Sequence, residues 1–394
     1  MFADRINRIQ PSATLEMTAK AAELRLKGLD VINLSVGEPD FNTPENIMNA
    51  AKTAMDSGYT KYTPGPGILD LRKAISKKLK RDNDLIYDAK EIIVSCGAKH
   101  SLYNACQVLF QKNDEVIIFS PYWVSFPDFV AVTGAKPIFV KTNFNKQYEP
   151  DFEDLENKIN SNTKGIIINS PSNPTGGVWS NEAIIQTLKI SKKYDLWVFS
   201  DECYEQLTYD RPFTSIATLS NNNNKILTFQ SCSKTYAMTG GRIGYTAGNK
   251  EVIKAMSKLQ GQSTSCPNSI AQYAAKEALE ANQQSVSNMR NIFRKRRKMI
   301  VEGINKISNI YCDNPGGAFY VFPNIEHFIN KEYNGKKIKS SSDLSMLLLQ
   351  EKLVVTVSGN SFGADGYIRI SYAASEKDIN NALIKIEELL LKIK

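Results

Sequence analysis

Histidine and paired cysteines are scarce in this sequence of 394 residues. Only His100 and His327 are present, and the six cysteines are scattered along the chain without a single Cys-x-x-Cys pair. These deficits argue against a zinc site, which needs clustered sulfur and nitrogen ligands. Scattered cysteines are typical of reduced thiols in a cytosolic protein. The sequence therefore predicts no metal and a cytoplasmic location.

Long apolar runs are also missing. The N-terminal stretch MFADRINRIQ has no apolar signal-peptide core, and no apolar run approaches the length that spans a membrane. We therefore expect no membrane partner.

Excess charge of one sign is modest, with a formal net charge of +8. Lys and Arg cluster only in KKLKR (77–81) and RKRRK (294–298). Both runs lie in helical-looking segments, so we interpret them as solvated helix faces. No interleaved aromatic pattern accompanies them, and no nucleic-acid partner is expected.

What the chain does contain, between about residues 90 and 250, is a series of apolar, β-branched runs separated by segments with helical periodicity, such as 99–111 and 181–194. Fully apolar strands that alternate with helices predict a mostly parallel sheet covered on both faces, which is an α/β domain. In such sheets, ligands bind at the carboxyl ends of the strands. The seven expected strands are 91–95, 115–120, 136–140, 165–170, 196–201, 225–231 and 242–248.

The pattern changes after about residue 250. A long helical region at 266–308 precedes two short strands, 318–322 and 367–372, and an amphipathic helix near 376–393. This pattern predicts a second, smaller α+β unit, and the loop-rich segment 1–45 is expected to pack with it. The predicted domains are therefore 46–285, and 1–45 together with 286–394.

Polar motifs follow several of the expected strands. In SCGAKHSL (95–102), Gly97 and Ala98 leave backbone N–H groups open at a helix N-terminus, which suits an anion, although a tight turn alone explains them equally well. In NSPSNPTGG (169–177), Asn173 precedes a proline, which favours an extended backbone and a fixed amide. In SDECYE (200–205), Asp201 ends a buried strand. It either needs a cationic partner or caps the next helix.

The stretch SCSKTYAMTGGRIGY (231–245) adds a lysine among phosphate-binding residue types. Ser231 and Ser233 offer hydroxyl donors, and Arg242 offers a planar fork for a phosphate. An isolated lysine is usually a surface charge. Lys234, if desolvated near other positive charge, would instead become a nucleophilic amine. Together with the strand-end acid and amide, these residues describe a Schiff-base lysine that holds pyridoxal phosphate.

These motifs and several others follow one another along nearly the whole chain, in an order that is typical of one protein family. In that order the chain resembles the fold-type I, class I/II pyridoxal-phosphate aminotransferases, and within them it is most similar to the bacterial aspartate aminotransferases. The resemblance implies the PLP-dependent transferase fold type I, in which a mostly parallel seven-stranded sheet lies between helices beside a smaller α+β domain. The motifs are PSAT (11–14), VGEPDFNTP (36–44), KYTPGPG (61–67), SPYWVSF (120–126), NSPSNPTGG, SDECYE, SKTYAMTGGRIGY, GAFYV (317–321) and YIRISYA (367–373).

The resemblance also implies roles for individual residues around the cofactor. Lys234 forms the Schiff base and moves the proton at the substrate Cα, and Asp201 pairs with the pyridine nitrogen. Asn173 and Tyr204 hydrogen-bond the phenolic oxygen, and Trp123 stacks on the ring. The phosphate is held by Ser231, Ser233, Arg242 and the backbone of Gly97, Ala98 and Lys99.

The substrate site and the partner follow from the same resemblance. Arg369 binds the substrate α-carboxylate, helped by the backbone of Gly37, with Trp123 and Asn173 also in contact with the substrate. Tyr62 reaches the phosphate in a partner subunit, so the resemblance implies a homodimer.

Substrate choice depends on the turn GAK (97–99). Its Lys99 stands where the bacterial aspartate enzymes bind the distal carboxylate, and Ser12 and Thr14 also match their pattern. We therefore expect transfer of the amino group of aspartate to 2-oxoglutarate, with glutamate and prephenate as further possible substrates. The alternatives left open are an aromatic, alanine or kynurenine aminotransferase or a C–S β-lyase. A cofactor-sensing regulator is disfavoured, because PSAT begins at residue 11 and leaves no room for a preceding DNA-binding domain.

Overall fold

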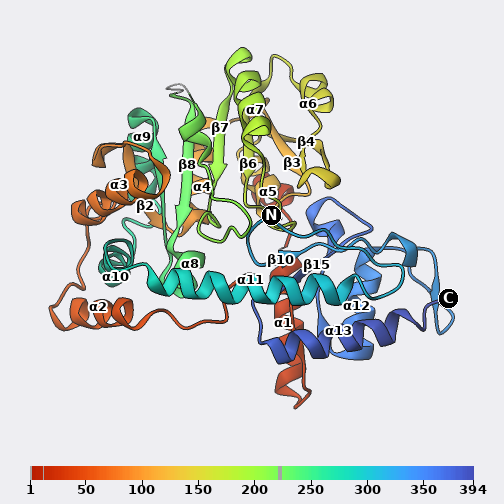
Figure 1. The fold of residues 1–394 in the computed structure, drawn as a ribbon. Helices are drawn as coiled ribbons and strands as arrows, with labels where there is room; N and C mark the ends of the chain where they lie inside the picture. The colour runs from red at the N-terminus through yellow and green to blue at the C-terminus, as the bar shows by residue number, and fades with distance from the viewer. Residues whose placement is uncertain (1, 12, 221–223) are drawn as a thin grey trace.

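The computed structural model describes residues 2–11, 13–220 and 224–394, without the side chains of residues 13–15. Its largest element is a mixed sheet in the order β2-β9-β8-β7-β6-β3-β4-β5 (Figure 1). The five strands from β8 to β4 run parallel, whereas β9 is antiparallel to both of its neighbours. The strands are β2 (Ile92–Cys96), β3 (Glu115–Ser120), β4 (Lys136–Asn143), β5 (Glu149–Pro150), β6 (Thr163–Asn169), β7 (Trp197–Asp201), β8 (Ile226–Ser231) and β9 (Ile243–Gly248).

All seven expected strands are therefore confirmed, and the sheet has one more. The additional strand, β5, has two residues and pairs antiparallel with the end of β4 at the sheet edge. Such a short element carries no periodicity from which the sequence could predict it.

Helices cover both faces of this sheet, as expected from its apolar strands. Consecutive residues of a strand point to opposite faces, so Ile117 joins one buried cluster and Ile118 the other. Helices α3, α7 and α10 pack on the first face and α4, α5 and α9 on the second. The helices of this part are α2 (Glu45–Asp56), α3 (Leu69–Asn83), α4 (Ala98–Leu109), α5 (Ser125–Ala131), α6 (Phe152–Lys158), α7 (Asn181–Lys193), α8 (Cys232–Thr235), α9 (Lys250–Gly261) and α10 (Ser269–Glu280).

A separate core forms around the C-terminal part of the chain. There β1 from the N-terminal segment pairs parallel with β13, and β10, β15 and β14 form an antiparallel sheet. The N-terminal segment thus packs with the C-terminal part, although α1 occupies much of what we expected to be loop. The elements are α1 (Ala13–Leu26), β1 (Ile32–Asn33), α11 (Gln284–Ile304), β10 (Tyr320–Val321), β11 (Glu332–Tyr333), β12 (Lys336–Lys337), α12 (Ser341–Lys352), β13 (Val354–Val355), β14 (Val357–Ser358), β15 (Ile368–Ser371) and α13 (Glu376–Leu390).

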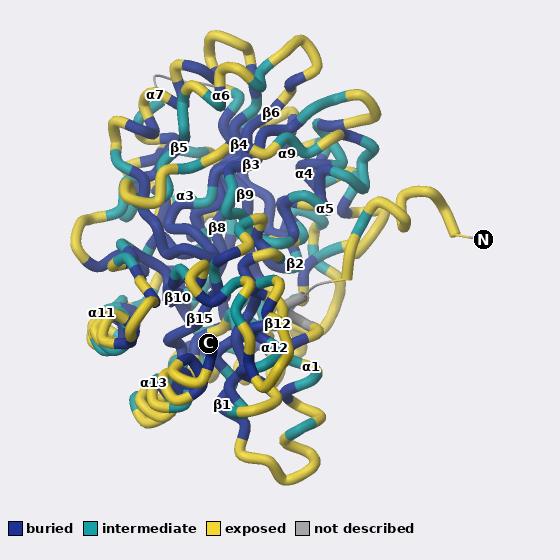
Figure 2. Tube along the Cα trace, turned by 90° about the vertical axis from the view of Figure 1, so that its right-hand side faces the viewer, coloured by how far each residue is buried: buried dark blue, intermediate teal, exposed yellow. Residues whose placement is uncertain are grey.

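Helix α11 runs from beside α10 to α13 and so connects the two cores (Figure 1). Its outer side and that of α13 are exposed, while the strands of the main sheet are mostly buried (Figure 2). Tyr204 and Leu207 belong to the same buried cluster as Phe293 of α11, so the two cores meet there. We retain the division into 46–285 and 1–45 plus 286–394 as a proposal. No described helix is long and apolar enough to cross a membrane.

The interpretation of the two basic runs as solvated helix faces is wrong for three of their residues. Lys78 of α3 is only 2% exposed, and Arg296 and Arg297 of α11 are also buried. Helical periodicity places Lys78 on the same face as Ile75, and both arginines on the face of Phe293. Their charges are paired instead: Arg296 contacts Asp40 at 2.7 Å, and Arg297 binds both carboxylate oxygens of Asp210.

Candidate active site

A cavity of about 250 Å³ opens where β6, β7 and β8 end. The last residues of these three parallel strands, Asn169, Asp201 and Ser231, all line it, as expected for a ligand site at the carboxyl edge of such a sheet. The cavity thus collects most of the site residues predicted from the sequence. Its lining consists of Gly37, Ala98, Lys99, Leu102, Trp123, Val124, Asn169, Asn173, Asp201, Cys203, Tyr204, Ser231, Ser233, Lys234, Arg242, Tyr320 and Arg369.

Lys234 lies in the short helix α8, which begins directly after β8. The Ser231 hydroxyl caps this helix by accepting a hydrogen bond from the Ser233 N–H at 3.0 Å. The ammonium group of Lys234 donates to the carbonyl of Gly37 at 2.5 Å. Desolvation lowers the pKa of Lys234 to about 8, so the neutral, nucleophilic amine is accessible near neutral pH.

Asp201 is a buried acid, and the nearby charge of Lys234 offsets the burial-induced rise in its pKa only in part. Its carboxylate accepts a hydrogen bond from the Cys203 N–H at 3.2 Å and forms no ion pair within the described residues. Burial raises its pKa to about 6. The alternative that Asp201 caps a helix is wrong, because a turn and not a helix follows it at residues 203–206. Among the described residues, no cation forms the expected ion pair with this carboxylate, which is therefore able to pair with a cationic group of a ligand.

The other end of the cavity forms an anion-binding corner. Gly97 caps α4 at a φ of 85°, and the N–H groups of Ala98 and Lys99 lie in the first helical turn, where no helix carbonyl can accept them. A Cβ added at Gly97 would overlap the guanidinium of Arg242. Ser231 and Ser233 line the same cavity, and the Ser231 hydroxyl donates to the Ile243 carbonyl at 3.2 Å. Guanidinium, hydroxyls and helix N-terminus together match the oxygens of a phosphate.

A buried arginine that forms no ion pair with any described acid completes the cavity. Arg369 of β15 is 1% exposed. It donates to Asn173 Oδ1 at 2.9 Å and to the Ser35 carbonyl at 2.5 Å. Its Nε has no hydrogen-bond partner in the part of the chain that the structure describes. Burying an unpaired charge is costly, so this guanidinium is arranged to receive an anion such as a carboxylate.

Tyr320 and Asn169 also belong to the site, although neither was singled out from the sequence. The Tyr320 hydroxyl lies 2.8 Å from the Tyr204 hydroxyl. The centroid of the Tyr320 ring lies 4.6 Å from the guanidinium carbon of Arg369. Asn169 accepts from the Asn173 N–H at 2.8 Å and so fixes that loop. Two signals could have found them: Tyr320 stands in the GAFYV motif, and Asn169 ends its strand as Asp201 does.

The remaining predicted residues divide into those near the cavity and those outside it. Lys99 is exposed at the mouth, with its Nζ 4.9 Å from the centroid of the Trp123 ring. Tyr62 is 90% exposed and does not line the cavity. Ser12 and the side chain of Thr14 lie outside the described residues.

The raised pKa of Asp201 predicts how the stability of the cofactor-free protein depends on pH. Between its unfolded value of 3.8 and about 6, the folded state holds a proton that the unfolded state has released. The contribution of Asp201 is therefore fully present below pH 3.8 and is lost as the pH rises through 6. Urea unfolding should give a free energy whose slope between pH 4 and 6 is less positive than in Asp201→Asn. Equal slopes would contradict the prediction.

Comparison with known proteins gives counterparts for the whole chain. A family model described as aminotransferase class I and II matches residues 29–386. An aspartate aminotransferase of Bacillus sp. (strain YM-2) is 43% identical, covering 99% of both chains. A probable aspartate/prephenate aminotransferase of Rhizobium leguminosarum bv. phaseoli is also 43% identical, covering 98% of both. The crystal structure of the aspartate aminotransferase from Rhizobium meliloti matches with a TM-score of 0.96 at 39% identity, covering 100% of both chains.

Proposed function

The chain belongs to the class I and II aminotransferase family, and on this basis we propose that it is a pyridoxal-phosphate-dependent aspartate aminotransferase. One observation carries the proposal: a single cavity holds an amine with a lowered pKa, together with a buried acid and a buried arginine that form no ion pair with any described residue. Lys234, Asp201 and Arg369 are these three groups. The amine can bind an aldehyde, the acid can bind a cationic nitrogen, and the arginine can bind a carboxylate. Pyridoxal phosphate and an amino-acid substrate together would supply these three groups.

The residues fit the cofactor at each of its polar atoms. Asp201 matches a protonated ring nitrogen, because its buried carboxylate forms no ion pair with any of the described residues. The anion-binding corner around Arg242 and Gly97 matches the phosphate. Asn173 uses its Oδ1 to accept from Arg369, which leaves its amide N–H₂ to donate to the phenolic oxygen together with the Tyr204 hydroxyl.

When bound, pyridoxal phosphate supplies an aldehyde that takes up an amino group and a ring that withdraws electrons from the substrate Cα. The residues of the chain bind and orient the substrate and move its proton. Arg369 binds the α-carboxylate and orients the substrate, with Trp123 and the Gly37 segment beside it. Lys234, as a free amine, would remove the proton at the substrate Cα. It would then deliver this proton to the cofactor carbon that had carried the aldehyde. The first substrate would then leave as a 2-oxo acid, with water supplying its keto oxygen. A second 2-oxo acid would enter the same cavity and receive the amino group, so the kinetics would be ping-pong.

Lys99 supports a substrate with a second carboxylate. Its ammonium lies at the mouth of the cavity beside Trp123, where the distal carboxylate of aspartate or glutamate would reach it. The two relatives described above are named for aspartate and for aspartate/prephenate. Prephenate also carries a second carboxylate, so it is a second candidate substrate for the same lysine.

The functional unit is proposed to be a cytoplasmic homodimer. Tyr62 has a 90% exposed side chain and does not line the active-site cavity. In the proposed dimer it donates to the phosphate bound in the partner subunit.

The test is a visible absorption spectrum of the protein loaded with pyridoxal phosphate, before and after addition of single amino acids. A cofactor band that aspartate or glutamate converts to the amino form of the cofactor supports the proposal. Conversion only by aromatic or small apolar amino acids would leave an aminotransferase of another specificity. The absence of any band after cofactor addition would overturn the role of Lys234.

Replacement of Lys99 by methionine should change specificity rather than chemistry. Losing one charge-assisted contact to the distal carboxylate should lower kcat/KM for aspartate by about 10–100-fold, and leave that for alanine unchanged. Lys254→Met, an exposed lysine of α9, is the matched control and should behave like the unmodified protein. Equal losses for aspartate and alanine would show that Lys99 serves the cofactor and not the distal carboxylate.

A further inference from the structure

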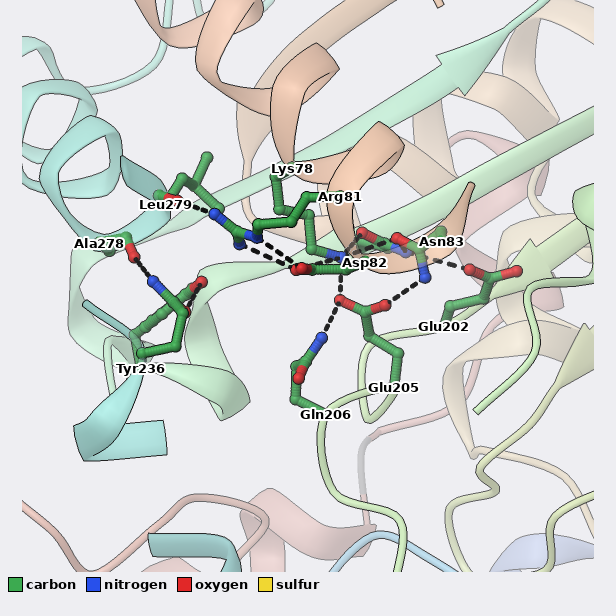
Figure 3. Close-up of polar contacts among 12 residues, drawn as sticks. Lys78, Arg81, Asp82, Asn83, Glu202, Glu205, Gln206, Tyr236, Ala278 and Leu279 are labelled. Carbon is green, nitrogen blue, oxygen red and sulfur yellow. Dashed lines mark hydrogen bonds and ion pairs between the residues drawn. The ribbon is translucent and has the colours of Figure 1, made fainter. Parts of the chain in front are cut away.

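A second group of buried polar side chains has none of the roles described so far. We name it the Lys78 cluster: Lys78 and Asn83 of α3 with Glu202 and Glu205 of the turn after β7 (Figure 3), together with Gln230 of β8. Each of the five side chains is at most 6% exposed. None of them lines the cavity. They come from three elements that are far apart in the sequence.

Lys78 is the hub of this cluster. Its Nζ donates to a carboxylate oxygen of Glu205, to Asn83 Oδ1 at 2.9 Å and to Gln230 Oε1 at 2.8 Å. Three acceptors match the three protons of an ammonium group. Asp82 lies farther away, at 3.8 Å, and its carboxylate is already engaged by Arg81 at 2.6 Å. Glu205 is therefore the principal counter-ion of Lys78.

Glu202 joins the cluster through Gln230. Its Oε1 accepts from the hydroxyls of Ser200 and Ser215 at 2.7 Å each, and its Oε2 accepts from the Gln230 amide at 3.1 Å. Asn83 in turn donates to Glu205 at 2.6 Å. The polar groups of the cluster are thus joined to one another and tie α3 to the ends of β7 and β8.

The placement of the cluster in the sequence connects it with the cavity. Glu202 directly follows Asp201, and Glu205 directly follows Tyr204. Gln230 directly precedes Ser231 on β8, where neighbouring side chains point to opposite sides. Three cavity residues, Asp201, Tyr204 and Ser231, are therefore each adjacent in sequence to a member of the Lys78 cluster.

Stability alone does not account for this arrangement. Moving two opposite charges out of water costs several kcal/mol per ion, and well-packed apolar residues are often as stable as a buried ion pair. A satisfied buried network does fix the geometry of the backbone segments that carry it. What it fixes here is the turn that presents Asp201 and Tyr204.

We propose that Lys78 is a positioning residue for the cofactor: through Glu205 and Gln230 it fixes the places of Asp201, Tyr204 and Ser231. The inference rests on the proposed function, because those three residues meet the cofactor only if pyridoxal phosphate binds. Lys78 itself contacts neither cofactor nor substrate. A shift of the turn would move the acid away from the ring nitrogen and the phenol away from the ring oxygen at the same time.

The experiment compares the double variant Lys78→Met/Glu205→Gln with the unmodified protein. Removing both charges together avoids an unpaired buried ion, and the amide oxygen of the introduced glutamine would still accept from Asn83. Lys77→Met, with its side chain 78% exposed on the same helix, is the matched control. The readouts are the dissociation constant for pyridoxal phosphate, the pH midpoint of the visible absorption change of the loaded protein, and the unfolding temperature without cofactor.

We expect the double variant to fold, to bind pyridoxal phosphate about tenfold more weakly and to show a displaced pH midpoint, as when an outer contact to a bound group is lost. The control should match the unmodified protein. A double variant with unchanged affinity and midpoint would overturn the inference and leave the proposed function intact. If the double variant does not fold, Glu202→Gln, which keeps the shape of the cluster, decides between the same two outcomes. An unmodified protein that takes up no pyridoxal phosphate would overturn the proposed function, and this inference with it.

Discussion

Lys234→Ala is expected to lose amino-group transfer between aspartate and 2-oxoglutarate by at least about 10⁴-fold, because one amine performs two tasks. As a nucleophile it attaches the cofactor, and as a free base it moves the proton at the substrate Cα. The other lysine of the lining, Lys99, is exposed beside Trp123 and lies in the first turn of a different helix, α4. We expect it to substitute for neither task.

The measurement is the steady-state rate together with the visible spectrum. Lys234→Arg keeps a positive charge but offers no neutral amine at neutral pH, so it should be as inactive as the alanine variant. The exposed Lys254→Ala should retain full activity. An arginine variant with more than a small fraction of the activity would show that Lys234 contributes only charge. It would remove the basis of the proposed mechanism.

The sheet could be predicted from the sequence because its signal is local. Strands such as Ile226–Ser231 are buried on both sides and therefore read as continuous apolar runs. In the second core the sequence predicts only two strands, 318–322 and 367–372, and the structure confirms both as β10 and β15. The other strands of this core, such as β13 and β14, have no comparable signal. β13 and β14 have two residues each, and their place depends on pairing with distant segments. Those pairings arise from tertiary contacts that no window of sequence contains.

The site shows the same division between local and distant information. Asp201 and Lys234 follow directly from polar residues at strand ends. Arg369 came only from the resemblance, because a single arginine inside a strand has no local mark of function. Lys78 was misinterpreted because helical spacing shows which face a charge lies on, but not whether an acid 127 positions away covers it. The surroundings of both residues are formed by distant segments, so they can be seen only in the folded chain.

Asp201→Asn is expected to have opposite effects on activity and on stability. The amide can no longer neutralise a protonated ring nitrogen, so the rate of transfer should fall by about 10³-fold, the upper range for one preorganised electrostatic group. In the cofactor-free protein the same change removes a buried charge. The pKa of Asp201 is raised from 3.8 to about 6, which corresponds to about 3 kcal/mol of unfavourable ionisation at pH 7.

The asparagine variant, whose Oδ1 can still accept from the Cys203 N–H, should therefore be more stable than the unmodified protein at pH 7 without cofactor. Urea unfolding measured at pH 7 and at pH 4 checks this, because the difference should nearly vanish at pH 4, where Asp201 is already protonated in the fold. Added pyridoxal phosphate should reverse the order at pH 7, since only the carboxylate gains a cation from it. If the variant were less stable at both pH values, Asp201 would serve the fold and its lack of a cation would say nothing about a ligand.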